Sequence, residues 1–157
     1  MPSPVMRALI FVLSSMLATS AWANTYQVGD QILDIKLQDQ HEAQYQVDST
    51  TTRVLFSSSM DGGTVIQETL EADPELVKDS TLIYVADISG MPSLIARFVA
   101  LPQFKKFPYR VALDNEGEQT KPLPAQKDQA TLIELNNNQI TNISYYETAD
   151  ALLAELK

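Results

Sequence analysis

A turn rich in serine and glycine is the part of this sequence best suited to chemistry. It covers residues 57–64, SSSMDGGT, between a short apolar run and a helical pattern. Backbone amides at the start of a helix can bind an anion or contact a peptide, although the carboxylate of Asp61 would repel an anion. The alternative is a plain turn in which Asp61 or Thr64 caps the helix. The phosphate-binding pattern GxxxxGK[ST] is missing, since no lysine follows.

The sequence offers few residues that could support a serine nucleophile or bind a metal ion. Residues 57–59 are three serines after a predicted strand, but the G-x-S-x-G motif is absent, and His41 would have to be the base. Met60 and Met91 with His41 could ligate cuprous copper, although methionines beside apolar helices more often fill gaps in a core. One histidine and no cysteine exclude a zinc site. We therefore expect no cofactor and no metal.

The segment FKKFPYR, residues 104–110, concentrates positive charge and aromatic rings in an acidic chain. Its cations Lys105, Lys106 and Arg110 form a candidate docking patch for an acidic partner. The alternative is a helix end, where lysines offset the helix dipole and the aromatic rings turn into the core.

The start of the chain and its charge narrow the class of protein. Arg7, the apolar stretch at residues 8–18 and the small residues Ala21 and Ala23 predict a signal peptide cleaved after Ala23. We expect residues 1–23 to be this leader, residues 24–157 to form one domain, and the mature protein to be periplasmic without membrane contact. The net charge of −9, with 20 acidic residues against 11 Lys and Arg, argues against a nucleic-acid partner.

Strand and helix patterns alternate along the rest of the chain. Strands are predicted at residues 31–38, 43–47, 54–56, 81–88, 109–113, 131–135 and 139–145. Helices are predicted from 64, after Asp73-Pro74, from 91–93 up to a bend or stop at Pro102, and after Thr148. This order predicts an α/β sheet flanked by helices, with an N-terminal β-hairpin, a terminal antiparallel hairpin and a C-terminal helix.

Four segments in this order resemble the thioredoxin-like superfamily, in the branch of peroxiredoxins and exported thioredoxin-like reductases. They are VGDQILDIKLQDQHEAQYQVD, VLFSSSMDGGT, YVADISGMPSLIARFVAL followed by FPYRVALDNEG, and ATLIELNNNQI. The resemblance implies redox cysteines at the start of the first long helix, where the helix dipole stabilises a thiolate. The matching positions here are Asp61 and Thr64. The family's cis-proline matches Ala130, whose preceding peptide bond we expect to be trans.

Because the chain has no cysteine, thiol–disulfide and thiol peroxidase activities are excluded. Three functions remain open. The first, which we expect, is a redox-inactive periplasmic protein that binds a protein or peptide on the family's substrate face. The second is an enzyme with non-thiol chemistry at Ser59, Asp61 or Thr64, and the third is an assembly subunit that docks through Phe104–Arg110. The residues of the predicted binding face are Ser59, Met60, Asp61, Gly62, Gly63, Thr64, Gln129, Ala130 and Thr131.

Overall fold

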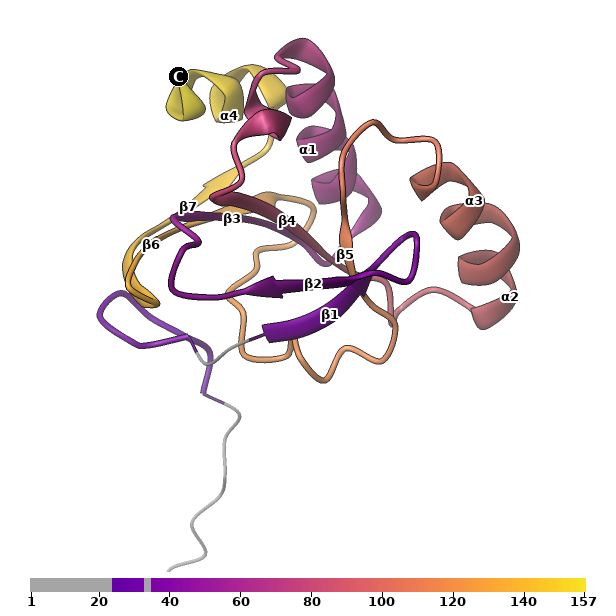
Figure 1. The fold of residues 1–157 in the computed structure, drawn as a ribbon, viewed down its shortest axis with the longest axis horizontal. Coiled ribbons are helices and arrows are strands. Elements are labelled where there is room, and N and C mark those ends of the chain that lie inside the picture. Colours follow the sequence, from indigo (N-terminus) through magenta and orange to yellow (C-terminus); the bar gives the residue numbers. More distant parts are fainter. Residues whose placement is uncertain (1–23, 33–34) are drawn as a thin grey trace, which may run out of the picture.

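A single mixed β-sheet of seven strands organises the computed structural model, which describes residues 24–32 and 35–157 (Figure 1). The predicted leader, residues 1–23, lies outside the described residues. The strand order is β2-β1-β5-β4-β3-β6-β7. Strands β5, β4 and β3 are parallel at the centre, and antiparallel strands extend the sheet on both sides.

The elements follow the predicted alternation of strands and helices. The strands are β1 (Ile35–Asp39), β2 (Gln44–Val47), β3 (Arg53–Ser57), β4 (Leu82–Asp87), β5 (Ala112–Asp114), β6 (Ala130–Asn136) and β7 (Gln139–Tyr146). The helices are α1 (Met60–Ala72), η1 (Leu76–Lys78), α2 (Ser93–Ile95), η2 (Ala96–Ala100), α3 (Leu101–Phe104) and α4 (Ala149–Leu156). The predicted fold class is confirmed, including both hairpins and the C-terminal helix capped by Thr148.

Two apolar clusters pack on opposite faces of the sheet. On one face, side chains of β3, β4 and β6 such as Leu55, Tyr84 and Leu132 pack against α1 and α4. In the view of Figure 1, α1 and α4 lie above the sheet, and α2 and α3 lie to its right. On the other face, Phe56 and Ile133 pack with β1 and with irregular chain segments that contribute Ile32 and Leu123.

Strand β5 is shorter than the predicted strand at residues 109–113. The side chain of the buried Gln40 takes the place of a neighbouring strand there. Its Nε2 donates to the carbonyl oxygen of Tyr109 at 2.6 Å, and its Oε1 accepts from the backbone N–H of Val111 at 2.9 Å. Backbone pairing with β1 starts only at Ala112, which lies opposite Asp39.

The helical segment from Ser93 to Phe104 continues through Pro102, so of the predicted bend or stop there, the stop is wrong. Its middle part, η2, is π-helical, and the N–H of Leu101 donates to the carbonyl oxygen of Ala96, five residues back. A proline lacks an N–H and crowds the preceding turn. The wider π turn before Pro102 accommodates both effects.

The predicted helix start at Asp73-Pro74 is also shifted. Asp73 accepts the backbone N–H of Glu75 on Oδ1, and its carbonyl oxygen accepts the N–H of Leu76. A short 3-10 turn, η1, follows only at Leu76–Lys78. Asp73 therefore forms a turn that ends α1 instead of capping a full helix.

Candidate functional site

The start of α1 is capped by Ser59. Its Oγ accepts the backbone N–H of Gly62 at 3.1 Å, and Met60 is the first helical residue. The prediction that Asp61 or Thr64 caps the helix is therefore wrong. Asp61 lies in the first turn, where its charge complements the helix dipole. The hydroxyl of Thr64 instead donates to the carbonyl oxygen of Met60 at 3.0 Å.

The predicted binding face has two parts, the start of α1 and residues 129–131. They are in direct contact, so no opening lies between Gly62 and Gln129. Gly62 is buried, and a Cβ built on it would lie 2.9 Å from the carbonyl carbon of Gln129. Ala130 and Thr131 are both fully buried. The peptide bond before Ala130 is trans, as predicted. Gly62, Ala130 and Thr131 are therefore closed to a partner, whereas Gln129 and the other residues at the start of α1 are half-buried or exposed.

A pair of hydroxyl groups lies beneath the first turn of α1. Ser57 Oγ and Tyr84 Oη are 3.1 Å apart, and both residues are only 4% exposed. Burial raises the pKa of Tyr84 to about 12, so its phenol stays protonated. Gly63 lies above the pair, and a Cβ on it would be 3.5 Å from Tyr84 Oη and 3.7 Å from Ser57 Oγ. A methyl group at Gly63 would therefore be in van der Waals contact with both hydroxyls.

An open groove of about 490 Å³ separates α1 from the helical segment α2–η2–α3. Tyr84 lies at its base. Its α1 wall includes Met60, Gly63, Thr64 and Gln67, and its other wall includes Met91, Ile95, Val99, Gln103 and Phe104. The groove lies beyond the carboxyl ends of β3 and β4, where open α/β sheets bind ligands.

Large apolar side chains are exposed around this groove. We call them the apolar patch: Met60 is 77% exposed, Leu94 70%, Ile95 48%, Phe98 67% and Val99 52%. Ile95 and Val99 line the groove, whereas Leu94 and Phe98 do not. Scattered apolar residues are normal on a surface, but three exposed apolar side chains that line one groove, Met60, Ile95 and Val99, make it a candidate interaction site. Periodicity predicted this helix, and only the tertiary structure shows that one side of it is uncovered.

The segment at residues 104–110 separates into three environments. Phe104, Phe107 and Tyr109 form a run of ring contacts, with centroids 5.7 and 5.0 Å apart, and pack against the helix-side core. Lys105 and Lys106 are exposed. The aromatic part thus matches the helix-end alternative, and only the two lysines present free charge to solvent.

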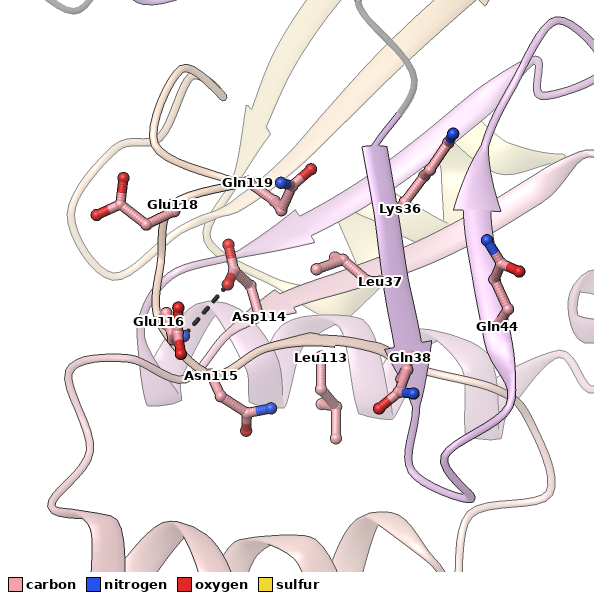
Figure 2. A pocket seen from close by; sticks show the side chains of 10 residues that line it. All are labelled: Lys36, Leu37, Gln38, Gln44, Leu113, Asp114, Asn115, Glu116, Glu118 and Gln119. Carbon is pink, nitrogen blue, oxygen red and sulfur yellow. Dashed lines mark hydrogen bonds between the residues drawn. The ribbon is translucent and has the colours of Figure 1, made fainter.

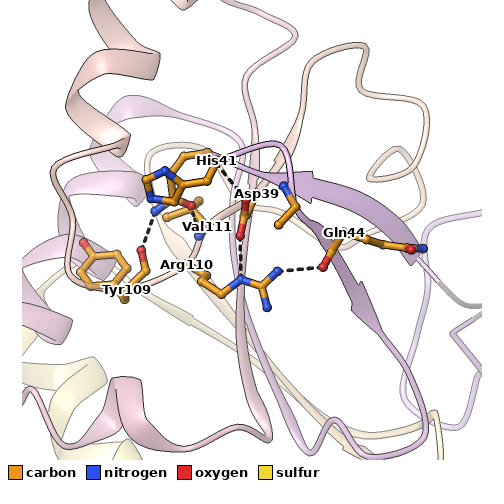
Figure 3. A network of polar contacts seen from close by, with 8 residues as sticks. Asp39, His41, Gln44, Tyr109, Arg110 and Val111 are labelled. Atoms are coloured by element: carbon orange, nitrogen blue, oxygen red, sulfur yellow. Dashed lines mark hydrogen bonds and ion pairs between the residues drawn. The ribbon is translucent and has the colours of Figure 1, made fainter.

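Unlike the two lysines, Arg110 makes an ion pair and a hydrogen bond to residues of the β1–β2 hairpin (Figure 3). Its Nε is 2.7 Å from Asp39 Oδ2, an NH2 group donates to the carbonyl oxygen of Gln44 at 2.7 Å, and its guanidinium lies 4.0 Å from the ring centre of Tyr45. Burial raises the pKa of the Asp39 carboxyl, but hydrogen bonds from Arg110 and from the backbone N–H groups of His41 and Ala43 outweigh it and lower the pKa overall. Arg110 therefore serves the structure of the β1–β2 hairpin.

The serine and copper hypotheses gain no support from this geometry. His41 lies in the β1–β2 turn beside the Arg110 network (Figure 3), and Ser57 is paired with Tyr84. Met60 and Met91 line the same groove, but His41 does not. Among the described residues, no cluster of three His, Cys, Asp or Glu side chains could hold a metal ion.

A second hollow of about 450 Å³ lies between β1 and the loop after β5 (Figure 2). It is polar, with Lys36, Glu116 and Glu118 around it. Asp114 at its edge accepts four hydrogen bonds, from the backbone N–H groups of Glu116, Gly117 and Thr120 and from the Thr120 hydroxyl. This carboxylate holds the loop in place and leaves little capacity for a ligand.

Comparison with known proteins identifies the fold. No protein-family model matches the sequence, and no curated protein matches it. Solved structures do match: the peroxidoxin BcpB of Mycobacterium tuberculosis, at 15% identity and a TM-score of 0.55, over 83% of this chain and 96% of that one. The fold is thioredoxin-like. The exposed lipoprotein thioredoxin of Streptococcus pneumoniae matches at 15% identity and a TM-score of 0.56, over 79% of this chain and 98% of that one.

A further thioredoxin-like match is described as a putative thiol:disulfide interchange protein DsbE of Chlorobium tepidum, at 17% identity and a TM-score of 0.55, over 85% of this chain and 100% of that one. Identities this low establish a shared fold and no shared activity. Ser59 caps the first long helix of this chain, two residues before Asp61, and the sequence contains no cysteine. No helix in residues 24–32 and 35–157 is long and apolar enough to cross a membrane.

Proposed function

We propose that this chain is an exported, redox-inactive thioredoxin-like protein that binds a segment of another protein in the groove between α1 and α2–η2–α3. The observation that carries the proposal is the part of the apolar patch that lines the groove: Met60, Ile95 and Val99 are exposed in an open groove of about 490 Å³. Burying such side chains against a partner is favourable by about 25 cal/mol per Å². The chemistry of a thiolate is excluded by the sequence, whereas binding requires only this surface.

The predicted binding face is retained in part under this proposal. Of its nine residues, Ser59, Met60, Gly63 and Thr64 line the groove. Ala130 and Thr131 are fully buried and therefore do not touch a partner. The opposite wall, with Ile95 and Val99, is a part that we did not predict to bind. Its signal in the sequence was the apolar run LIARFVAL, which is also what a buried helix shows.

Two double variants on one helix test the site. Ile95→Gln with Val99→Gln changes the groove wall, and Leu94→Gln with Phe98→Gln makes a similar change on exposed residues outside the groove. We expect the tagged wild-type protein to capture a discrete partner from periplasmic extract, and the groove variant to lose at least about tenfold of it. The control variant should keep its capture. Loss in the control with retention in the groove variant would place the interface elsewhere.

Export is tested separately by intact-mass measurement on protein recovered from the periplasm. A chain that starts at Asn24 supports both the leader and the location. Recovery of the chain in the cytoplasm, or with residues 1–23 attached, would contradict this part of the proposal and leave the groove unaffected.

A further inference from the structure

We infer that the occupant of the groove is an apolar peptide segment flanked by basic side chains. This inference rests on the proposed function and names the class of partner for the same site. It combines the walls of the groove, the Tyr84 hydroxyl at its base and the charge of the protein around it.

The size of the groove limits how much of a partner it holds. One turn of an α-helix with its side chains is about 10–12 Å wide and 5.4 Å long, which corresponds to roughly 500 Å³. The groove of about 490 Å³ therefore accepts a few apolar side chains and not a whole domain. Met60, Ile95 and Val99 are exposed and offer the contacts for them.

The hydroxyl pair favours a peptide over a plain hydrocarbon chain. Ser57 and Tyr84 carry two hydroxyl protons, and their mutual hydrogen bond uses one of them. The second proton needs an acceptor, because a buried donor without one is costly. When Ser57 donates to Tyr84, the remaining proton is that of Tyr84, which lines the groove, and a backbone carbonyl of a bound peptide is an acceptor for it. An acyl chain offers no such group at that depth.

The charge distribution favours basic flanks. Among the described residues, the half-buried Asp87 is the one charged residue that lines the groove, and the exposed Asp61 follows Met60 at the start of α1. The cations of the opposite segment are Arg97, Lys105 and Lys106, none of which lines the groove. The guanidinium of Arg97 lies 5.7 Å from the ring centre of Phe98, outside the groove. The lining is therefore negative where it is charged.

The net charge of the whole chain also separates a basic partner from a second copy. Each copy carries a net charge of −9, so two copies repel each other as they approach. A basic segment is attracted by the same field, which speeds its encounter at low ionic strength. The acidic headgroup of a fatty acid would be repelled in the same way as a second copy.

Three peptides with one apolar core test the inference. The core Leu-Phe-Val-Leu is flanked on both sides by two Lys, two Gln or two Glu residues. Each peptide carries a fluorescent label, and its binding to the processed protein is measured by anisotropy. At about 20 mM salt we expect the Lys peptide to bind at least tenfold more tightly than the Gln peptide, and the Glu peptide to bind most weakly. At about 300 mM salt the preference should fall to a few-fold, because screening shortens the reach of the charges.

Charge variants locate the effect at the groove. Asp61→Asn with Asp87→Asn should remove most of the preference for the Lys peptide over the Gln peptide. Glu75→Gln with Glu155→Gln removes two exposed carboxylates at η1 and α4 and is the matched control. The preference should persist in that control. Equal loss in both variants would mean that only net charge matters, which would overturn the assignment to this groove.

The remaining outcomes separate the inference from the proposed function. If all three peptides bind equally and Ile95→Gln with Val99→Gln abolishes binding, the groove binds peptides but the basic class is wrong. If none binds and sedimentation shows a dimer that the same variant dissociates, the occupant is a second copy and the inference is overturned. If none binds, the protein is monomeric and the variant captures partners as well as wild type does, the proposed function itself fails.

Discussion

Gly62 packs directly against the carbonyl group of Gln129, so the start of α1 and the loop before β6 are held together by a contact that allows no side chain. A Cβ on Gly62 would lie 2.9 Å from the carbonyl carbon and closer still to the oxygen. The next residue, Gly63, has only ordinary van der Waals neighbours at 3.5 Å or more. Two adjacent glycines in one helix turn thus have different roles.

Alanine at these two positions should have opposite effects on stability. Gly63→Ala should raise the free energy of unfolding by about 0.5–1 kcal/mol, because alanine favours the helix. Gly62→Ala should lower it by about 1–3 kcal/mol, because the backbone of Gln129 must move. Chemical denaturation measures both. In the peptide assay, Gly63→Ala should weaken binding despite its added stability, since its methyl group covers the Ser57–Tyr84 pair; unchanged binding would show that the pair is not contacted.

The helix cap gives a second prediction. Ser59→Ala should cost about 1 kcal/mol of unfolding free energy through the lost bond to the N–H of Gly62. Thr148→Ala, the cap of α4, is the matched control and should cost a similar amount. Asp61→Ala should cost less, because it contributes through the helix dipole alone. A larger loss for Asp61→Ala than for Ser59→Ala would contradict this assignment of the cap.

Ser57 and Tyr84 should behave as a coupled pair. Ser57→Ala or Tyr84→Phe alone should each lower the free energy of unfolding by about 1–2 kcal/mol, since one buried hydroxyl is left without its partner. The double variant should cost less than the sum of the two, because no hydroxyl is stranded. A double-variant cycle by denaturation tests this, and strict additivity would show that the two hydroxyls act independently.

The stability of the β1–β2 hairpin should depend on pH through Asp39. The pKa of this carboxyl is lowered in the folded state, so its contribution is complete above the ordinary value of about 3.9 and is lost as the pH falls through the folded pKa. Asp39→Asn should lower the free energy of unfolding near neutral pH by about 1–3 kcal/mol and flatten its acid dependence. Asp150→Asn, an exposed carboxylate on α4, should leave the profile nearly unchanged. An Asp39→Asn profile as steep as that of wild type would refute the role of this pair.

Thiol chemistry should be absent under every condition. A mixed disulfide needs a thiolate, and the chain has no cysteine. The purified protein should therefore match buffer in insulin reduction and in peroxide consumption. Turnover that persists through purification and scales with protein concentration would contradict the redox-inactive proposal.

The order of elements could be predicted from the sequence because local patterns carry it. Alternation of apolar and polar residues marked the strands, and Thr148 marked the start of α4. The absence of thiol chemistry also follows from the sequence alone, since it needs no geometry. The ends of an element could not be predicted where a residue distant in sequence changes the backbone pairing. The side chain of Gln40 does this when it bonds the backbone of Tyr109 and Val111, so that β5 begins later than the pattern predicts.

The candidate site, by contrast, was decided by tertiary structure. The apolar run of residues 94–101 has the same pattern whether a helix is covered or open, and only packing leaves Leu94, Ile95, Phe98 and Val99 exposed. The sequence places Arg110 in a cationic segment, whereas in the structure its Nε lies 2.7 Å from the carboxylate of Asp39, which is 71 residues away in sequence. Exposure, ion pairing and the contact between Gly62 and Gln129 all depend on neighbours that the fold brings together, and a linear pattern cannot specify them.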